Sequence, residues 1–168
     1  DALGTIWEQV LSDNPAPRAY APHAADIGLR TLRHLAQDYL LAANPAAHLD
    51  AAHSLYEPAD NLTDRLAALR WITHYEAVEK REAVLADFYS RWQHEALVVN
   101  QWLTVQATRP EVDCVDSVRA LMTHPAFDWR NPNKLRALIG AFAGANPIAF
   151  HREDGAGYRL IGEVIERL

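Results

Sequence analysis

The amino-acid sequence predicts an all-α fold, a right-handed superhelix of antiparallel helix pairs of the HEAT or armadillo kind. The dominant apolar spacing is i, i+3, i+4, i+7, as in Leu135, Leu138, Ile139 and Phe142, and it places these side chains on one face of a helix. No useful length of the chain alternates apolar with polar residues, as a half-buried strand would. No strict repeat length appears, which indicates a loose solenoid rather than a tetratricopeptide array.

The expected helices follow one another with short connections, which favours antiparallel neighbours in a single helical domain over residues 1–168. We expect helices at residues 2–11, 24–43, 46–56, 61–74, 77–92, 94–107, 113–122, 132–143 and 156–168. Residues 12–23, "SDNPAPRAYAPH", are rich in proline and polar side chains and are expected to form a loop. Gly144 is expected to end its helix as the C-cap, after which the chain restarts at Asn146.

Asparagine and aspartate side chains mark several of these helix starts. Asn44 and Asn131 each precede a proline, which combines a capping amide with a residue suited to the first helical position. Asn61 and Asp113 are each followed three residues later by an aspartate, which lies near the positive end of the helix dipole. We therefore expect these four side chains to cap helices.

The helix expected at 132–143 carries a second, polar face. At about 100° per residue, Asn133, Arg136 and Gly140 cluster within roughly 60° of arc. A glycine in an exposed helix interior costs about 1 kcal/mol relative to alanine, so we expect a neighbouring helix or a bound ligand to come close to Gly140. Arg136 is either a solvated or salt-bridged arginine or a contact for an anion or peptide, since its forked donors suit a carboxylate or a peptide carbonyl.

Composition and charge exclude several classes of partner. The chain has 16 lysine and arginine residues against 22 aspartate and glutamate residues, a formal net charge of -6. This balance argues against nucleic acid or an anionic membrane as the main partner, because both require a basic surface. No apolar run is long enough to span a bilayer.

The single cysteine and the two ends of the chain indicate its context. Cys114 cannot form an internal disulfide, so we expect it to be a buried core residue of a protein in a reducing, cytoplasmic compartment. Residue 1 is aspartate, and the last residues, "YRLIGEVIERL", keep a helical rhythm without a capping residue. We therefore expect the chain to be a piece of a longer polypeptide, cut at both ends.

The eight histidines do not form a metal-binding motif. A zinc peptidase helix requires H-E-x-x-H, because the two imidazoles must lie four residues apart on one face. In "HEALV", His94 and Glu95 are present but Val98 occupies the place of the second histidine. The chain also has no nucleophile elbow, phosphate-binding loop or dinucleotide-binding glycine pattern. The sequence therefore predicts no catalytic residue and no metal ligand.

Several of these segments resemble one known family. The stretches "NPNKLRALIGAFAGANP" (131–147) and "FHREDGAGY" (150–158) closely resemble the C-terminal helical domain of bacterial aminopeptidase N, a zinc aminopeptidase of the gluzincin class. The segment "REAVLADFYSRWQHEALVVNQWLTVQA" (81–107) is similar to the preceding part of the same domain. The resemblance is strongest over 121–168 and weaker before residue 60.

The resemblance implies a parent enzyme in which this helical domain closes over a zinc-containing catalytic domain, encloses the substrate chamber and gates the entry of peptides. In the family, the arginine of the pattern matching "NPNKLR" faces that chamber and can contact a peptide, and this arginine is Arg136 here. Asn133 and Gly140 share its helix face, so these three residues are the predicted substrate-binding set.

The resemblance does not extend to the catalytic centre. The chain lacks H-E-x-x-H, the downstream glutamate ligand and the exopeptidase glycine motif of the family. It therefore implies no cofactor in this chain and zinc in the full-length parent, with the catalytic domain of the same polypeptide and peptide substrates as partners. The alternative is a free-standing helical-repeat scaffold that binds a protein on its concave surface.

Overall fold

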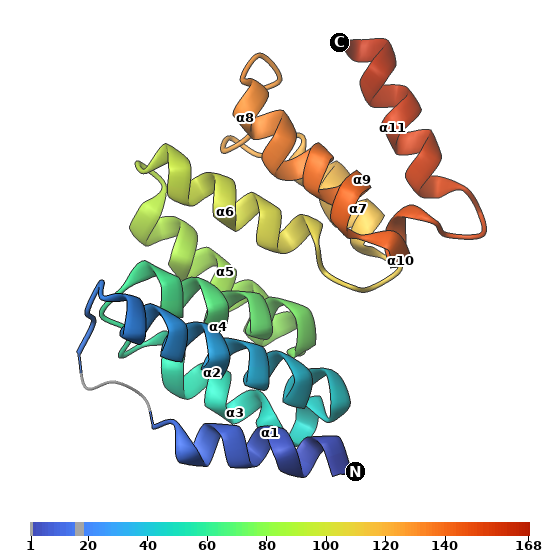
Figure 1. The fold of residues 1–168 in the computed structure, drawn as a ribbon. Helices are drawn as coiled ribbons and strands as arrows, with labels where there is room; N and C mark the ends of the chain where they lie inside the picture. Colours follow the sequence, from blue (N-terminus) through green and yellow to red (C-terminus); the bar gives the residue numbers. More distant parts are fainter. Residues whose placement is uncertain (1, 16–18) are drawn as a thin grey trace. The chain divides into compact units, whose positions relative to one another are not determined.

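The fold is seen in a computed structural model, which describes residues 2–15 and 19–168 (Figure 1). Every regular element within these ranges is a helix. The chain divides into two compact units, Asp1–Ala77 and Val78–Leu168.

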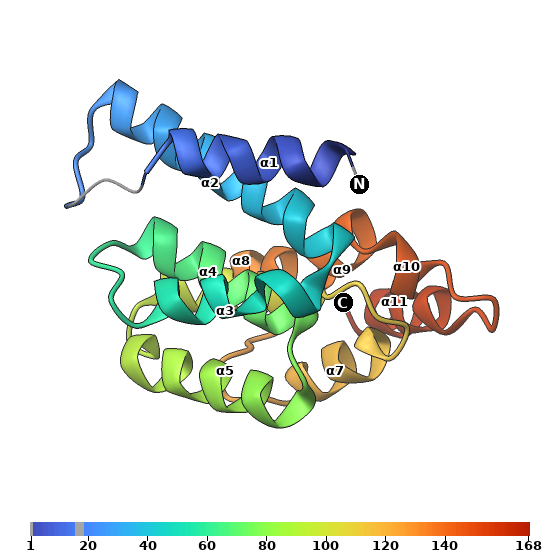
Figure 2. The ribbon, with the colours of Figure 1, turned by 90° about the horizontal axis from the view of Figure 1, so that it is seen from below.

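The first unit is built from four helices in the described residues. They are α1 (Ala2–Asp13), α2 (Ala24–Ala43), α3 (Pro45–Tyr56) and α4 (Leu62–Tyr75). Helix α1 lies beside α2, and α3 lies beside α4 (Figure 2). The core of this unit consists of apolar side chains with almost no exposed surface, among them Ala36, Leu40, Leu41, Ala52, Ala68, Leu69 and Ile72. Helix α1 is held partly by Trp7, whose ring stacks on Tyr39 of α2 at a centroid distance of 4.8 Å.

The second unit contains the remaining elements. They are α5 (Val78–Trp92), α6 (Ala96–Ala107), α7 (Cys114–Leu121), α8 (Pro132–Leu135), the π-helical turn η1 (Arg136–Gly140), α9 (Ala141–Ala145), α10 (Pro147–Phe150) and α11 (Ala156–Arg167). Helices α8, η1 and α9 form one continuous helical segment, 132–145, which packs along α6. The core includes Phe88, Leu103, Val118, Leu138, Phe142 and Leu160, all fully buried.

The positions of the expected helices agree closely with the structure. Helix α2 has the predicted bounds, and most other ends differ by one or two residues. Residues 14–15 and 19–23 of the expected loop are not helical, whereas α1 continues to Asp13, and residues 16–18 lie outside the described part. Helix α10 was not predicted as an element, because four residues are too few to show a helical period.

Three of the four expected caps are formed. The side-chain oxygens of Asn44, Asn61 and Asn131 accept hydrogen bonds from backbone N–H groups in the first turn of α3, α4 and α8, at 3.3, 2.9 and 3.0 Å. Asp113 precedes α7 but makes no side-chain cap. Its carboxylate instead lies 2.9 Å from Nη1 of the buried Arg109, because an ion pair with a guanidinium competes for the same oxygens.

The prediction that Gly144 ends its helix was wrong. Helix α9 continues through Gly144 to Ala145 and ends at Asn146, which is almost fully buried. The Asn146 side chain donates to the carbonyl oxygens of Ala107 and Arg109, at 3.0 and 2.8 Å, and accepts from the N–H of Ala149 at 3.2 Å. These three bonds fix the turn between α9 and α10, so a glycine cap is not needed.

A close backbone approach explains one glycine of "EDGAGY". A Cβ added at Gly157 would overlap the carbonyl oxygen and the Cα of Phe150, so α11 can approach the end of α10 only because residue 157 lacks a side chain. Gly155, just before α11, has φ of 72°, in the left-handed region that glycine adopts without strain.

Replacing Gly157 by alanine is expected to lower the free energy of unfolding by about 3 kcal/mol, because α11 must move away from Phe150. The matched control is Gly162→Ala on the same helix, where no heavy atom lies within 4 Å of an added Cβ. This control is expected to raise stability by up to about 1 kcal/mol. Urea unfolding followed by circular dichroism measures both changes, and equal stabilities would contradict the packing described.

Candidate functional site

The predicted substrate-binding residues Asn133, Arg136 and Gly140 lie together on the exposed side of the 132–145 segment; we call them the Arg136 surface. The guanidinium Nη1 of Arg136 donates to Oδ1 of Asn133 at 3.2 Å. The nearest side-chain atom to a Cβ added at Gly140 is Cβ of Arg136, at 3.9 Å. The structure therefore brings all three residues together, as helix geometry predicts, and their role in binding stays a prediction.

The backbone of this surface differs from the α-helix that the sequence predicts. Residues 136–140 form a π-helical turn, in which the hydrogen bonds span five residues instead of four. The hydroxyl of Thr104 on α6 donates to the carbonyl oxygen of Ala137 within this turn, at 3.0 Å. A wide turn disturbs the regular ladder of backbone bonds, and a side-chain donor from a neighbouring helix stabilises such a break. Single π turns occur frequently at functional sites.

The opposite face of the segment anchors it in the core. Ala137 and Ile139 are each 8% exposed, and Leu138 and Phe142 are fully buried. Burying a large aliphatic or aromatic side chain stabilises a fold by roughly 1.5–3 kcal/mol. The polar face is therefore presented by a segment whose other side is fixed by packing.

Gly140 is not explained by tight packing within the described residues. A Cβ at this position would meet nothing closer than 3.9 Å, which is ordinary van der Waals contact. In the described part of the chain, no neighbouring helix therefore comes close enough to require a glycine at this position. Close approach of a ligand or another part of a longer polypeptide stays a prediction.

Lys134 was not singled out from the sequence, although it lies in the same segment. Lys134 is only 8% exposed, and its Nζ donates to the carbonyl oxygen of Ala96 at the start of α6, at 3.5 Å. Burial lowers the pKa of Lys134 below its ordinary value. Its position four residues before the buried Leu138 is the signal that could have placed it on the inner face.

The histidines are mostly engaged in pairwise contacts. His34, His53 and His151 lie 2.8, 2.7 and 2.6 Å from Asp64, Glu76 and the Tyr158 hydroxyl, respectively. His94 is exposed at the turn before α6. Among residues 2–15 and 19–168, no group of three or more histidine, cysteine, aspartate or glutamate side chains is placed to hold a metal ion.

Cys114 lies fully buried at the start of α7, as expected for a core residue. Burial raises the pKa of its thiol to about 11. A thiol with such a raised pKa is a poor nucleophile at neutral pH, because the thiolate is the reactive form. Of the helices described, none combines the length and the apolar character that crossing a membrane requires.

Comparison with known proteins identifies the family to which this helical domain belongs. The chain belongs to the family described as "Domain of unknown function (DUF3458_C) ARM repeats", which matches residues 1–168. The expectation of an all-α fold of armadillo-type helical repeats is thereby confirmed.

The particular relatives are aminopeptidases. The chain is 44% identical over 143 residues to Aminopeptidase N of Haemophilus influenzae, a match that covers 85% of this chain and 16% of that protein. It is 36% identical over 149 residues to Aminopeptidase N of Escherichia coli, which covers 89% of this chain and 17% of that protein. For Aminopeptidase N of Caulobacter vibrioides the identity is 34% over 163 residues, covering 97% of this chain and 19% of that protein.

A solved structure shows the same relationship. The crystal structure of Legionella pneumophila aminopeptidase A in complex with aspartic acid superposes with a TM-score of 0.86 and 29% sequence identity, over 98% of this chain and 20% of that one. The resemblance to the C-terminal helical domain of bacterial aminopeptidase N is thus confirmed. The chain spans less than a fifth of the length of each of these three Aminopeptidase N proteins.

The Thr104 hydroxyl is expected to stabilise the π turn. Replacing Thr104 by valine removes the donor to the Ala137 carbonyl and should lower the free energy of unfolding by about 1 kcal/mol. Thr31→Val is the control, because the exposed Thr31 hydroxyl donates to the carbonyl oxygen of Ile27 within its own helix, at 2.8 Å. This substitution should lower the free energy of unfolding by less than about 0.5 kcal/mol. If both variants lose the same free energy of unfolding in urea, the hydrogen bond from Thr104 of α6 to the π turn contributes nothing to stability.

Proposed function

We propose that this chain is the C-terminal helical domain of a zinc aminopeptidase N that removes N-terminal residues from peptides in the cytoplasm. In this proposal residues 1–168 form a single helical domain that encloses the substrate chamber and gates access to it. The observation that carries the proposal is the identity of 34–44% to proteins named Aminopeptidase N over 85–97% of this chain. Identity at this level extends over nearly the whole chain and is not confined to one motif.

The zinc of this enzyme would belong to the catalytic domain of the same polypeptide. The described residues of this chain offer no ligand set for it. When bound in the catalytic domain, the metal would supply an activated water for attack on the first peptide bond. The contribution of the helical domain is therefore to bind and admit substrate.

The Arg136 surface supports a role in contacting the peptide. Arg136 is exposed and makes no ion pair with a carboxylate in the described residues, where its guanidinium donates to the side chain of Asn133. A guanidinium without a carboxylate partner keeps its forked donors free for a peptide carbonyl or a C-terminal carboxylate. The open space at Gly140 leaves room for a peptide backbone beside it.

The alternative of a free-standing repeat scaffold is tested by the reading frame itself. A frame that encodes H-E-x-x-H upstream in the same polypeptide supports the aminopeptidase. A frame limited to these 168 residues would support the scaffold.

Changing Arg136 to alanine in the full-length enzyme is expected to raise KM for peptides of three or more residues by roughly tenfold, since hydrogen bonds to charged groups contribute about 1.5–3 kcal/mol. Turnover of a single-residue anilide substrate should change little, because it lacks the distal carbonyls and carboxylate. Steady-state kinetics on both substrate types measure the difference.

Arg130→Ala is the matched control, because the Arg130 side chain is 92% exposed and its ion-pair partner is Asp128, only two residues away. Gly140→Ala is a second probe, since its Cβ fits without moving any neighbour. Unchanged kinetics of the Arg136 variant on both long and short substrates would remove Arg136 from the binding site.

A further inference from the structure

The exposed side of helix α2 carries no charged side chain. All 20 residues of this helix are described, and half of them are exposed. A helix on a protein surface usually has charged and polar residues on the side that faces water. The exposed residues of α2 are instead small or apolar, apart from one threonine. We call them the α2 outer face; they are Ala24, Ala25, Ile27, Gly28, Thr31, Leu32, Leu35, Tyr39, Ala42 and Ala43.

The α2 outer face is continuous along the helix. Its large apolar side chains are between 37 and 52% exposed; they are Ile27, Leu32, Leu35 and Tyr39. Three of them follow one line at a spacing of four residues, and Thr31 of the same line donates its hydroxyl to the carbonyl oxygen of Ile27. Single exposed leucines are ordinary, whereas a contiguous apolar surface marks an interaction site. A helix of this length is about 30 Å long, so the face can hold a neighbouring helix along its length.

The exposed sides of two helices in the second unit differ from this face. Helix α5 exposes Glu79, Lys80 and Glu82, and helix α11 exposes Glu163 and Glu166. Charged residues on the exposed side are therefore present where this chain meets water, and their absence from α2 is specific to that helix.

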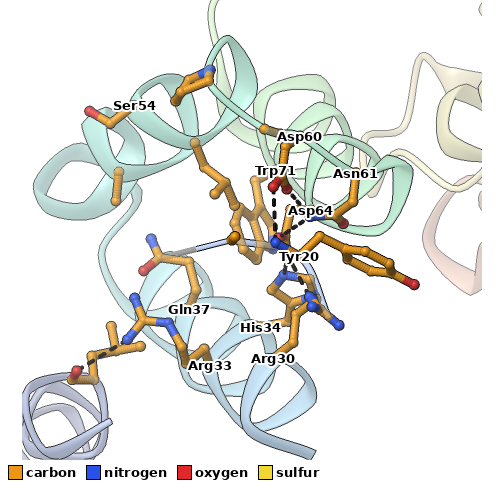
Figure 3. A pocket seen from close by; sticks show the side chains of 16 residues that line it. Tyr20, Arg30, Arg33, His34, Gln37, Ser54, Asp60, Asn61, Asp64 and Trp71 are labelled. Atoms are coloured by element: carbon orange, nitrogen blue, oxygen red, sulfur yellow. Dashed lines mark hydrogen bonds and ion pairs between the residues drawn. The ribbon is translucent and has the colours of Figure 1, made fainter. Parts of the chain in front are cut away.

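The polar side chains of α2 point to the inside of the first unit. Figure 3 shows Arg30, His34 and Gln37 directed toward α3 and α4, and Arg33 directed toward α1. Arg30 is 5% exposed, and its Nε lies 3.5 Å from Oδ2 of Asp64 on α4, although its buried Nη2 has no acceptor in the described residues. Nε2 of His34 lies 2.8 Å from Oδ1 of the same aspartate.

The remaining contacts tie α2 to α1 and α3. Arg33 donates to the carbonyl oxygens of Leu11, at 3.2 Å, and of Asn14. The Gln37 amide donates to the carbonyl oxygen of His48 on α3, at 3.0 Å. Hydrogen bonds are directional, so contacts with three neighbouring helices fix the rotation of α2 about its axis. The helix cannot turn its apolar side inward without leaving buried charged groups unpaired.

We propose that the α2 outer face is covered by an apolar helix from the part of the polypeptide that lies outside residues 1–168. This inference rests on the proposed function. The three Aminopeptidase N proteins have more than four fifths of their length outside the part that this chain matches. A segment of the same polypeptide is held near the face at a high effective concentration, which favours it over a second copy of the chain.

The chemistry of the face defines its partner. A surface without charges selects an apolar partner, because a charged group brought onto it would lose water without gaining an ion pair. Ala24 and Gly28 are one turn apart and let a helix axis approach closely, since packing distances depend on the side chains at the contact. A membrane surface fits less well, because helices that lie on membranes are rich in lysine and arginine on their polar face, and the exposed residues of α2 include neither.

The first test maps the partner by photo-cross-linking in the polypeptide at its natural length. Leu35 is replaced by p-benzoylphenylalanine, and mass spectrometry after illumination and proteolysis locates the attachment point. The expected product joins position 35 to a residue outside 1–168 of the same molecule. The matched control places the same group at Ala83, which is exposed beside Glu79 and Glu82 on α5 and should give little cross-linked product.

The second test measures access to the same two positions. Leu35→Cys and Ala83→Cys are labelled with a maleimide in the native polypeptide. The cysteine at position 35 should react roughly tenfold more slowly or less, because a covered thiol is inaccessible to the reagent. Cys114 does not interfere, since it is buried and its thiol pKa is raised to about 11.

Four results would overturn the proposal. They are equal labelling rates at the two positions, equal cross-linking yields from them, a cross-link from position 35 to residues 78–168, and a cross-link that joins two copies. In the last case labelling at position 35 would also slow with increasing protein concentration.

Release of the N-terminal residue from a peptide, measured on the same polypeptide, separates this proposal from the proposed function. Hydrolysis by a polypeptide whose position 35 reacts freely would overturn the covered face alone. A covered position 35 in a polypeptide that hydrolyses no peptide would overturn the proposed function alone.

Discussion

The second unit depends on one buried amide, that of Asn146. Its side chain is almost fully enclosed and joins the end of α6 to the junction between α9 and α10 through two donated bonds and one accepted bond. Buried backbone carbonyls must find donors, and the carbonyls of Ala107 and Arg109 receive theirs from this amide. An aspartate could accept from Ala149 but could not donate to the two carbonyls, so an amide is the side chain that satisfies both roles.

The same helix, α6, sets the backbone of the Arg136 surface. Thr104, three residues before Ala107, donates to a carbonyl in the π turn, and the buried Leu138 and Phe142 hold the rest of the segment in the core. A surface that contacts a flexible peptide has to be rigid, because disorder in the protein would add to the entropy lost on binding. The packing behind Arg136 therefore matters to the proposed function as much as the exposed guanidinium itself.

Local chemistry explains why much of this fold could be predicted from the sequence. The asparagine caps at Asn44, Asn61 and Asn131 act within three residues of themselves, so their sequence context already contains both partners. The Arg136 surface was found in the same way, since Asn133 and Arg136 are one helical turn apart. The prediction of a C-cap at Gly144 failed because the helix ends at Asn146, whose side chain takes its partners from the last residue of α6 and from Arg109 just beyond it, nearly 40 residues earlier. The π turn was missed for a similar reason, as its stabilising donor is Thr104.

By itself, the sequence determined the all-α class, the places of the helices and the polar face around Arg136, because helical period and capping are properties of neighbouring residues. Only the tertiary structure decided which polar residues meet in space. The first unit shows this most clearly, since Arg30 and His34 of α2 reach Asp64 of α4, some thirty residues away. A buried guanidinium without a full set of acceptors is a property of three-dimensional enclosure, and no local pattern on α2 separates it from an arginine in solvent.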